Sequence, residues 1–290
     1  MIGPAGSPVV VGTLASAERW SLPHERLDRR AMASRYPQFR LADGDEAVFE
    51  AIAGWVSPEA GVTAHLDMAK AAGADLRFGV RIDGWDVSPV GVEVVVDGER
   101  WGATRLVLTA GAWAAGALAA AGQPLPLRPV RRVVGFFQPH DPADFTPERF
   151  PIYVFQLRDG DAIYGLPETA PGRGVKVGFH YRGPDVDPDT IDRTVTDEEV
   201  DALRSVLAER IPGLSGRCLR TSVCMYTMTP DEHFVIGTLP STHSRVVVAA
   251  GFSGHGYKFA PVIGEILADL AATGATDHVI EFLSPARFTG

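Results

Sequence analysis

The segment Val175–His180 carries two side chains that could do chemistry on a strand-like pattern. With the two-residue period of a strand, Lys176, Gly178 and His180 share one face, while the alternate residues are apolar and face the core. An ammonium group and an imidazole with open space between them can stabilise negative charge and exchange protons. The plainer interpretation is a polar face that meets solvent, because charged side chains are mostly exposed. From these residues alone, the plainer interpretation is the stronger one.

A glycine-rich turn, Gly251–Lys258, lies between an apolar run and an amphipathic helical run. Turns at the start of a helix direct backbone N–H groups and the positive end of the helix dipole at an electron-rich group. Lys258 closes the turn, and a cation beside a helix N-terminus is unfavourable unless an anion occupies the site. The turn therefore indicates a carboxylate or another electron-rich ligand. A lysine that simply reaches solvent explains the sequence at least as well.

The same turn is similar to the Gly-x-Ser-x-Gly nucleophile elbow of α/β-hydrolases, with Ser253 at the central position. Its fifth position holds His255 in place of glycine. Hydrolases also need an acid and a histidine later in the chain, and there His278 has Asp277 as its immediate neighbour. A hydrolase is therefore a weak alternative.

Cys224, one of two cysteines in the chain, lies on an apolar strand-like run, and its plainer interpretation is a buried free thiol. Cys218 has no functional counterpart, and we interpret it as structural. Two cysteines six residues apart fit neither a disulfide framework nor a zinc site, which needs more ligands. Asp231-Glu232-His233 is rejected as a metal cluster, because three adjacent side chains do not converge easily on one ion. No metal is expected.

Gly111 follows the apolar run Leu106–Thr109 and precedes an alanine-rich helical run. A turn of small residues at the carboxyl end of a strand lets the backbone approach a ligand closely. A tight strand-to-helix turn selected for packing is an equally good interpretation.

The elements that must position these residues alternate between β-rich and α/β blocks. Strands are expected at 9–12, 75–80, 92–96, 105–109, 132–138, 152–156, 162–166, 175–180, 219–226 and 245–251, and helices at 23–36, 58–72, 197–211 and 262–270. Ser57 is the expected N-cap of the second helix and Gly73 the residue after its end, and Thr196 is the expected N-cap of the third, with Glu199 in its first turn. The alternation predicts two interwoven domains. One comprises 1–56 and 126–233, and the other comprises 57–125 and 234–290.

The composition of the chain argues against several classes of protein. The net charge of −9 argues against a nucleic-acid partner, which requires a basic surface. No apolar run approaches the roughly 20 residues of a membrane span, so no membrane is expected as a partner. The N-terminus has neither the basic start nor the apolar centre of a secretory signal. With 46% apolar and 22% charged residues, the chain has a globular composition, and we expect it to be cytoplasmic.

The turn Gly251–Lys258 and the run Cys224–His233 closely resemble the C-terminal part of the monomeric sarcosine oxidase and N-methyltryptophan oxidase family. Its members are flavoenzymes that oxidise N-methyl amino acids. The resemblance implies an α/β fold with two interleaved domains. The domain of 57–125 and 234–290 would be an FAD-binding domain of the glutathione-reductase type, and the domain of 1–56 and 126–233 would be a mixed β-sheet substrate domain. It also implies a monomer with bound FAD, and a small amino acid and O₂ as its reaction partners.

A Lys-x-Gly-x-His strand also occurs in this family. By that resemblance Lys176 lies over the flavin ring and activates O₂, because a fixed cation stabilises the superoxide-like charge that develops. His180 would tune the substrate amine, which must lose its proton before it gives up a hydride. Tyr164 matches a tyrosine that lines the substrate pocket, although the loop from Tyr164 to Lys176 is one residue longer than in the family pattern.

The resemblance also gives roles to the glycine turn. Lys258 would pair with the substrate carboxylate. The turn begins at Gly251, and the backbone of Gly254, His255 and Gly256 would face the pyrimidine edge of the flavin, where reduction places negative charge.

Two further positions would hold the cofactor. Cys224 matches the cysteine that is joined covalently to the flavin ring, a link that fixes the cofactor and can raise its reduction potential. Gly111 corresponds to a position that lies against the dinucleotide.

Families of this kind open with a strand, a Gly-x-Gly-x-x-Gly turn and a helix that cradle the dinucleotide. No such constellation occurs in these 290 residues, so the chain is expected to represent roughly the last three quarters of a family member, truncated at its start. Loss of the first βαβ unit would leave neighbouring strands with unpaired edges. Two hypotheses follow. The chain belongs to an N-methyl amino acid oxidase whose sequence starts late, or it is a non-catalytic fragment unable to hold FAD.

Overall fold

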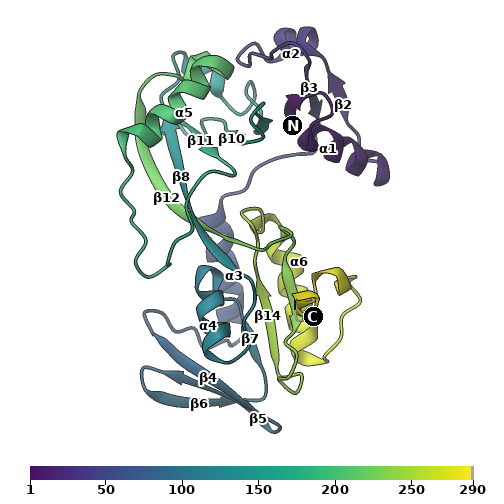
Figure 1. Ribbon diagram of the computed structural model, residues 1–290, viewed down its shortest axis with the longest axis vertical. Coiled ribbons are helices and arrows are strands. Elements are labelled where there is room, and N and C mark those ends of the chain that lie inside the picture. Colours follow the sequence, from purple (N-terminus) through teal and green to yellow (C-terminus); the bar gives the residue numbers. More distant parts are fainter. Residues whose placement is uncertain (289–290) are drawn as a thin grey trace. The chain divides into compact units, whose positions relative to one another are not determined.

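The computed structural model describes residues 1–288, a mixed α/β fold that divides into two compact units (Figure 1). Unit 1 comprises Met1–Trp55, Arg131–Pro184 and Asp192–Cys224, and unit 2 comprises Val56–Val130, Asp185–Ile191 and the described chain from Met225 onward. The chain changes unit inside two long strands, β8 (Arg128–Phe137) and β12 (Cys218–Met228). The α/β class predicted from the sequence is confirmed.

Unit 1 is built on an eight-stranded sheet with the order β12-β8-β11-β10-β9-β1-β3-β2. Besides β8 and β12, its strands are β1 (Ile2–Pro4), β2 (Glu25–Leu27), β3 (Asp45–Phe49), β9 (Tyr153–Gln156), β10 (Ala162–Leu166) and β11 (Val175–Phe179). Strands β8, β11, β10 and β9 form an antiparallel series, whereas β9 and β1 run parallel. This order places β10 and β11, which carry predicted site residues, side by side in the sheet.

One face of this sheet is covered by helix α5 (Asp197–Arg210), as Figure 1 shows. Leu207 of the helix and Val177 of β11 are fully buried in the same core. The helix begins with the predicted capping box, in which Thr196 and Glu199 satisfy each other's backbone N–H groups. Two shorter helices complete the unit, α1 (Pro8–Arg19) and α2 (Arg29–Arg35).

Unit 2 contains two three-stranded sheets, β13-β14-β7 and β4-β5-β6. Their strands are β4 (Ile82–Ser88), β5 (Gly91–Val96), β6 (Glu99–Ala103), β7 (Leu106–Leu108), β13 (Val235–Thr238) and β14 (Val246–Ala250). Strand β14 pairs antiparallel with β13 and parallel with β7, so β7 is an edge strand within the described chain.

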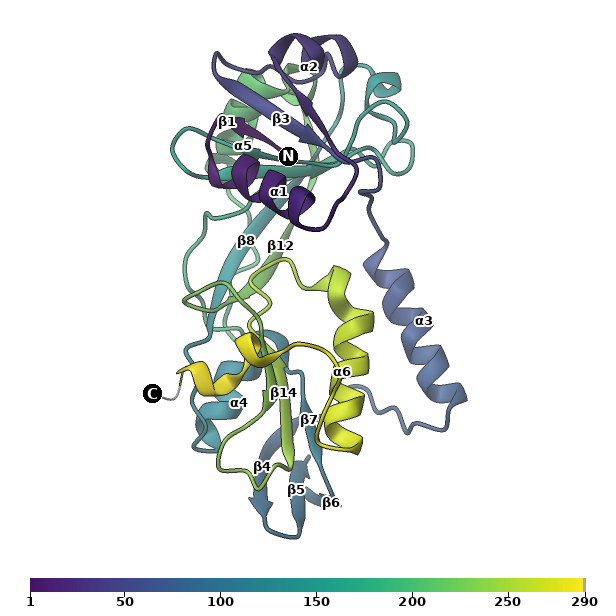
Figure 2. The same cartoon turned by 90° about the vertical axis from the view of Figure 1, so that its right-hand side faces the viewer.

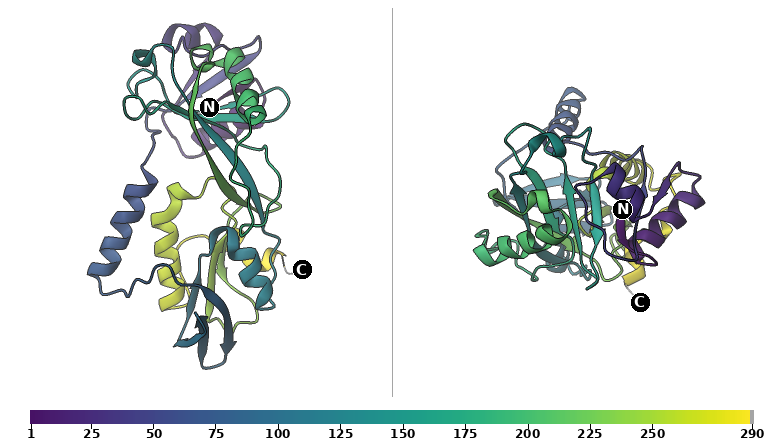
Figure 3. Two further views of the ribbon diagram at one scale, coloured as in Figure 1. Left: turned by 90° about the vertical axis from the view of Figure 1, so that its left-hand side faces the viewer. Right: turned by 90° about the horizontal axis from the view of Figure 1, so that it is seen from above.

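The helices of unit 2 are α3 (Pro58–Ala71), α4 (Ala114–Ala120) and α6 (Ala260–Ala272). Helices α4 and α6 lie on opposite sides of β14 (Figures 2 and 3). Ile266 of α6 shares a core with Val247 of β14, and Leu118 of α4 shares another core with Val248. Because successive strand residues face opposite sides, β14 is buried on both faces, which explains its uninterrupted apolar sequence.

Helix α3 has the ends that the sequence predicts. The Ser57 side chain accepts a hydrogen bond from the Ala60 N–H, and Gly73 follows the helix with φ +92°. No residue of α3 is buried. No helix within residues 1–288 is both long and apolar enough to cross a membrane.

The expected strand at 9–12 is wrong, because these residues lie inside α1. Pro8 occupies the first turn of that helix, where its fixed φ and missing N–H are tolerated. The valine run suggested a strand, but Ala17 and Val10 instead form the buried side of a helix.

Two other expectations also need correction. Residues 75–80 form no strand. The helix expected at 23–36 is shorter, since β2 precedes it and Asp28 caps α2 by accepting from the Ala31 N–H. Strands β4, β6 and β13 were not expected from the sequence.

Candidate active site

Four predicted residues belong to unit 1, and three of them form one group on its sheet. In the antiparallel register Tyr164 of β10 stands opposite Gly178 of β11, so it lies between Lys176 and His180 on the same face. The Lys176 Nζ is 5.8 Å from the centre of the Tyr164 ring, and the His180 ring meets that ring edge to face at 6.3 Å. The sheet thus brings an ammonium, a phenol and an imidazole together.

The space at Gly178 is not open, which corrects the sequence interpretation. A Cβ atom there would lie 3.1 Å from the Tyr164 hydroxyl oxygen and 2.9 Å from a methyl group of Val134. Glycine at this position therefore makes room for the tyrosine ring between the two basic side chains.

Arg132 of β8 joins this group and was missed from the sequence. It is only 3% exposed, and its Nε donates a hydrogen bond to the His180 carbonyl oxygen at 3.0 Å. A buried guanidinium adds positive charge to the face that already carries Lys176. The one signal in the sequence was an arginine pair, Arg131-Arg132, directly before the apolar run Val133–Phe137.

Cys224 lies on β12 as a free, partly buried thiol. Burial raises the pKa of this thiol, whereas Lys176, Arg132 and Arg193 act in the opposite direction because positive charge favours the thiolate. Burial suits a structural thiol, whereas the neighbouring cations would help a reactive thiol to ionise. The position of Cys224 is compatible with either role.

A cavity of about 710 Å³ opens in unit 1 beside Tyr164. Its walls are largely apolar and include the aromatic side chains of Phe39, Phe49 and Trp55. Tyr153 also lines it, and its hydroxyl has no hydrogen-bond partner within residues 1–288. Burial raises the pKa of this phenol. The volume lies within the roughly 300–1,000 Å³ of pockets that hold small organic ligands.

The glycine turn, which belongs to unit 2, is shaped by its own aromatic neighbours. Gly251 and Gly254 have φ values of +65° and +82°. A Cβ atom at Gly254 would lie 2.2 Å from the Tyr226 ring, and one at Gly256 would lie 2.5 Å from the Cβ of Phe252. Close packing within the chain therefore accounts for glycine at positions 254 and 256.

Lys258 and His255 supply the polar groups of this turn. The Lys258 Nζ donates to the His255 carbonyl oxygen at 3.2 Å, and no carboxylate within residues 1–288 forms an ion pair with it. Partial burial lowers the pKa of both side chains. Helix α6 follows the 3₁₀ turn Tyr257–Phe259, within which the Phe259 N–H donates to the Gly256 carbonyl oxygen at 2.9 Å and the Ala260 N–H donates to the Tyr257 carbonyl oxygen. A cation that no carboxylate of the described chain pairs with can accept an anionic group.

Gly111 opens a 3₁₀ turn, Gly111–Trp113, directly after β7, with φ +55°. A Cβ atom there would meet nothing within 4 Å. The backbone conformation alone favours glycine, and the open side leaves room for a ligand to approach.

Ser253 does not have the surroundings of a catalytic nucleophile. It is 1% exposed, and its Oγ donates to the Gly251 carbonyl oxygen and accepts from the Thr229 N–H. His278, the candidate base, lies 3.5 Å from Glu265. The hydrolase alternative is therefore unsupported.

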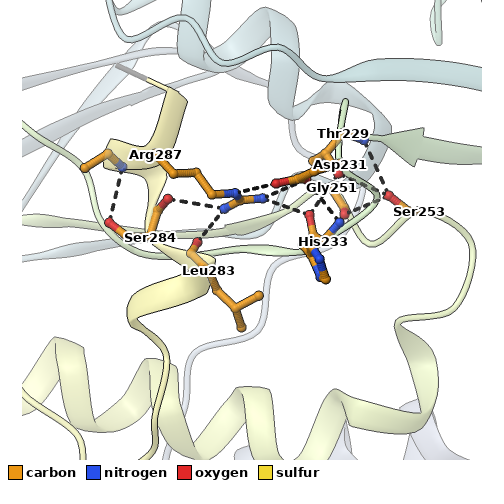
Figure 4. A network of polar contacts seen from close by, with 9 residues as sticks. Thr229, Asp231, His233, Gly251, Ser253, Leu283, Ser284 and Arg287 are labelled. Atoms are coloured by element: carbon orange, nitrogen blue, oxygen red, sulfur yellow. Dashed lines mark hydrogen bonds and ion pairs between the residues drawn. The ribbon is translucent and has the colours of Figure 1, made fainter. Parts of the chain in front are cut away.

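Asp231 belongs to a polar network that the sequence did not predict (Figure 4). Arg287, near the end of the described chain, pairs with it at 2.9 Å. The hydrogen bond from Arg287 lowers the pKa of Asp231 to about 2. No group of three His, Cys, Asp or Glu side chains within residues 1–288 is arranged to hold a metal ion.

Comparison with known proteins places this architecture in a family. The sequence profile of the family described as FAD dependent oxidoreductase matches residues 8–270. The chain belongs to this family. The monomeric sarcosine oxidase of Streptomyces avermitilis is 43% identical over 289 residues, which cover 99% of this chain and 75% of that protein. The N-methyl-L-tryptophan oxidase of Salmonella enteritidis is 35% identical over 276 residues, covering 93% and 71%.

Solved structures of other oxidoreductases have the same fold as this FAD-dependent oxidoreductase. NikD, an amino acid oxidase essential for nikkomycin biosynthesis, matches in its open form with a TM-score of 0.80 and 25% identity, over 95% of this chain and 72% of NikD. L-proline dehydrogenase from P. horikoshii matches with a TM-score of 0.78 and 25% identity, over 94% and 70%. The predicted family and the prediction of an oxidase are confirmed.

The residues present fit the chemical needs of FAD. In unit 2, Lys258 offers positive charge to an electron-rich ring edge, and the backbone at Gly111 is open to a ligand. In unit 1, Lys176 and Arg132 place positive charge near Cys224. These features suit a cofactor that gains negative charge on reduction.

Proposed function

We propose that this FAD-dependent oxidoreductase oxidises the N-methyl group of a secondary amino acid such as sarcosine. The amine loses two electrons and two protons to become an imine, O₂ takes them up as hydrogen peroxide, and water hydrolyses the imine to formaldehyde and the demethylated amino acid. The observation that carries the proposal is the Tyr164, Lys176 and His180 group on the sheet of a chain 43% identical to a monomeric sarcosine oxidase.

Each residue of unit 1 has a distinct part in this proposal. FAD, when bound, accepts a hydride from the substrate and passes the electrons to O₂. The Lys176 ammonium stabilises the negative charge that develops as O₂ is reduced. His180 influences the proton of the substrate amine, and the Tyr164 ring between them limits where the amine can lie. Cys224 provides the thiol for covalent attachment of the flavin.

The glycine turn of unit 2 would hold charged groups. Lys258 pairs with the substrate carboxylate. No carboxylate within residues 1–288 forms an ion pair with Lys258, so the substrate would supply the negative charge. The backbone of Gly254, His255 and Gly256 lies along the flavin edge. Gly111 leaves its backbone open to the dinucleotide, whereas Gly251, packed against Thr229 and Leu127, begins the turn that would face the cofactor.

The visible absorption spectrum of the purified chain, recorded before and after acid precipitation, tests the cofactor. Flavin absorbance that stays with the precipitate supports FAD attached through Cys224, and the Cys224→Ala variant should then release its flavin. Peroxide formation with sarcosine, N-methyl-L-tryptophan and L-proline then defines the substrate. A flavin-loaded protein that forms no peroxide with any N-methyl amino acid contradicts the proposal.

A second proposal is that these 290 residues alone do not retain FAD. The exposed helix α3 and the edge strand β7 favour it, because both leave part of unit 2 uncovered. The chain also spans about three quarters of the length of its curated relatives. A colourless protein that stays colourless after incubation with FAD would support this second proposal.

A further inference from the structure

The last described turn of the chain is tied to the loop between β12 and β13 (Figure 4). The Nε and Nη2 of Arg287 donate to the Asp231 carboxylate at 2.9 and 3.2 Å, and Nη2 also donates to the His233 carbonyl at 3.0 Å. Its Nη1 donates to the carbonyls of Leu283 and Ser284 at 2.9 and 3.2 Å. All five N–H donors of the guanidinium are therefore used, a fit that a lysine could not reproduce.

The loop held by Arg287 is also closed by its own hydrogen bonds. The Asp231 carboxylate accepts from the His233 N–H at 3.1 Å, and the Thr229 hydroxyl donates to the His233 carbonyl at 2.8 Å. Between them Glu232 has φ +59°, a conformation that is unfavourable for this residue type. Such a conformation persists only where the surrounding contacts hold it, and Arg287 supplies several of them.

This loop contacts the glycine turn directly. The buried Ser253 Oγ accepts from the Thr229 N–H at 3.4 Å, and the Ser253 N–H donates to the Thr227 carbonyl at 3.0 Å. The ring of Phe234 lies 4.9 Å from the ring of His255, at an angle of 35°. The conformation of one segment therefore constrains the other.

The pKa of the His255 imidazole depends on groups of this loop and of the glycine turn. Burial and the charge of Lys258 lower its pKa, and His233 acts in the same direction. A hydrogen bond with the backbone of Glu232 and the charge of the Glu232 carboxylate act in the opposite direction. The loop from Thr229 to His233, which Arg287 holds, therefore supplies through Glu232 the interactions that favour the protonated imidazole.

We propose that Arg287 is a positioning residue for His255. It holds the loop from Thr229 to His233, which bonds to Ser253 of the glycine turn and leads into Phe234, whose ring lies against the imidazole. The consequence for the cofactor rests on the proposed function, under which His255 lies at the flavin edge. The C-terminal turn would then control the orientation and proton affinity of a group beside the isoalloxazine ring.

The test is a pH titration of the His255 ring by NMR in the Arg287→Gln variant, with the resonance assigned by its loss in His255→Asn. We expect the pKa of His255 to fall by about 0.5 and its ring resonances to shift, because the backbone and the carboxylate of Glu232, which favour the protonated imidazole, move when the loop is released. Arg287→Lys should restore the charge but only part of the effect. The matched control is Arg77→Gln, since Arg77 forms an exposed ion pair with Asp75 in the same unit and should leave His255 unchanged.

Unchanged ring resonances and an unchanged pKa of His255 in folded Arg287→Gln would overturn the proposal. If that variant does not fold, Asp231→Asn answers the same question, because it keeps the shape and one acceptor oxygen of Asp231 while removing the ion pair. The fraction of added FAD that each variant retains is measured separately. A shifted His255 in a protein that never binds FAD would leave the positioning role intact and count against the proposed function alone.

Discussion

The sheet-face group of unit 1, Tyr164, Lys176 and His180, and the glycine turn of unit 2 are built on opposite principles. In the sheet, regular antiparallel pairing fixes the backbone, and the side chains of one face are free to carry chemistry. In the turn, the backbone itself is the functional part, and it is held by positive φ angles and by aromatic rings packed against Gly254 and Gly256. A substitution in the sheet-face group can therefore change the chemistry without changing the stability of the fold. A substitution in the glycine turn changes both.

Because of this difference, substitutions in the two regions should affect different properties: activity in the sheet-face group and stability in the glycine turn. A substitution at Lys176 removes a functional group from a partly exposed face without disturbing the pairing of β11. A substitution at Gly254 must move the Tyr226 ring before any ligand is considered. The predictions below test whether the two regions respond in these two ways.

The largest effect is expected from Lys176→Met in flavin-loaded protein. The rate of flavin reoxidation by O₂ should fall by about 10²–10³-fold, because a fixed charge near the reacting oxygen is lost. The free energy of unfolding should change by less than about 0.5 kcal/mol. Stopped-flow absorbance measures the rate, and Lys70→Met on exposed α3 is the matched control. An unchanged reoxidation rate would exclude the role assigned to Lys176.

Gly254→Ala should act mainly on stability. The added Cβ needs space occupied by Tyr226 and a φ of +82°, so we expect a loss of about 2–4 kcal/mol in the free energy of unfolding. Gly264 lies inside α6, where an added Cβ would meet nothing within 4 Å, and Gly264→Ala should instead add about 0.5–1 kcal/mol. Urea unfolding compares the two. Equal effects of both substitutions would show that the turn is not under packing constraint.

Asp231→Asn should make stability less dependent on pH. The carboxyl has a pKa of about 2 in the folded chain against an ordinary value of 3.8, so its ionised form stabilises the fold above pH 4 and this contribution disappears as the pH falls toward 2. Because the pair is partly exposed, we expect a difference from the parent of about 1 kcal/mol at neutral pH. Urea unfolding at pH 7, 4 and 2.5 checks this. A difference that is as large at pH 2.5 as at pH 7 would contradict the ion-pair explanation.

The smallest effect concerns the thiol of Cys224. Lys176 lowers the pKa of this thiol, so Lys176→Met should raise it and slow alkylation by iodoacetamide at pH 8 by about two- to threefold. Peptide mass spectrometry gives the rate at Cys224, and Cys218 provides an internal reference. An unchanged rate would mean that Lys176 has no electrostatic influence on Cys224.

Local rules predicted the parts of this chain that depend on neighbouring residues. Thr196 and Glu199 form the expected capping box, and Ser57 and Gly73 bound α3 as expected. The same rules failed at residues 9–12, where three valines suggested a strand but the proline-led start of α1 and its packing produced a helix. Tertiary packing overrides the β-preference of valine when one helical side can be buried.

Long-range contacts could not be predicted by such rules. Arg132 reaches the His180 carbonyl across 48 positions, and Arg287 reaches Asp231 across 56. Arg287 does not differ by type or spacing from an ordinary surface residue in the sequence, and Arg132 stands out only as part of the pair Arg131-Arg132. Their roles follow from burial and from acceptors that only the folded chain brings within hydrogen-bond distance.

The sequence by itself determined the family, the α/β class, and the shared face of Lys176 and His180, because strand periodicity and short motifs are local properties. Only the tertiary structure decided that the Tyr164 ring fills the space between them and that the glycines at 254 and 256 accommodate aromatic rings. The physical reason is that occupied volume and satisfied hydrogen bonds depend on segments far apart in the chain, which a linear pattern does not place in contact.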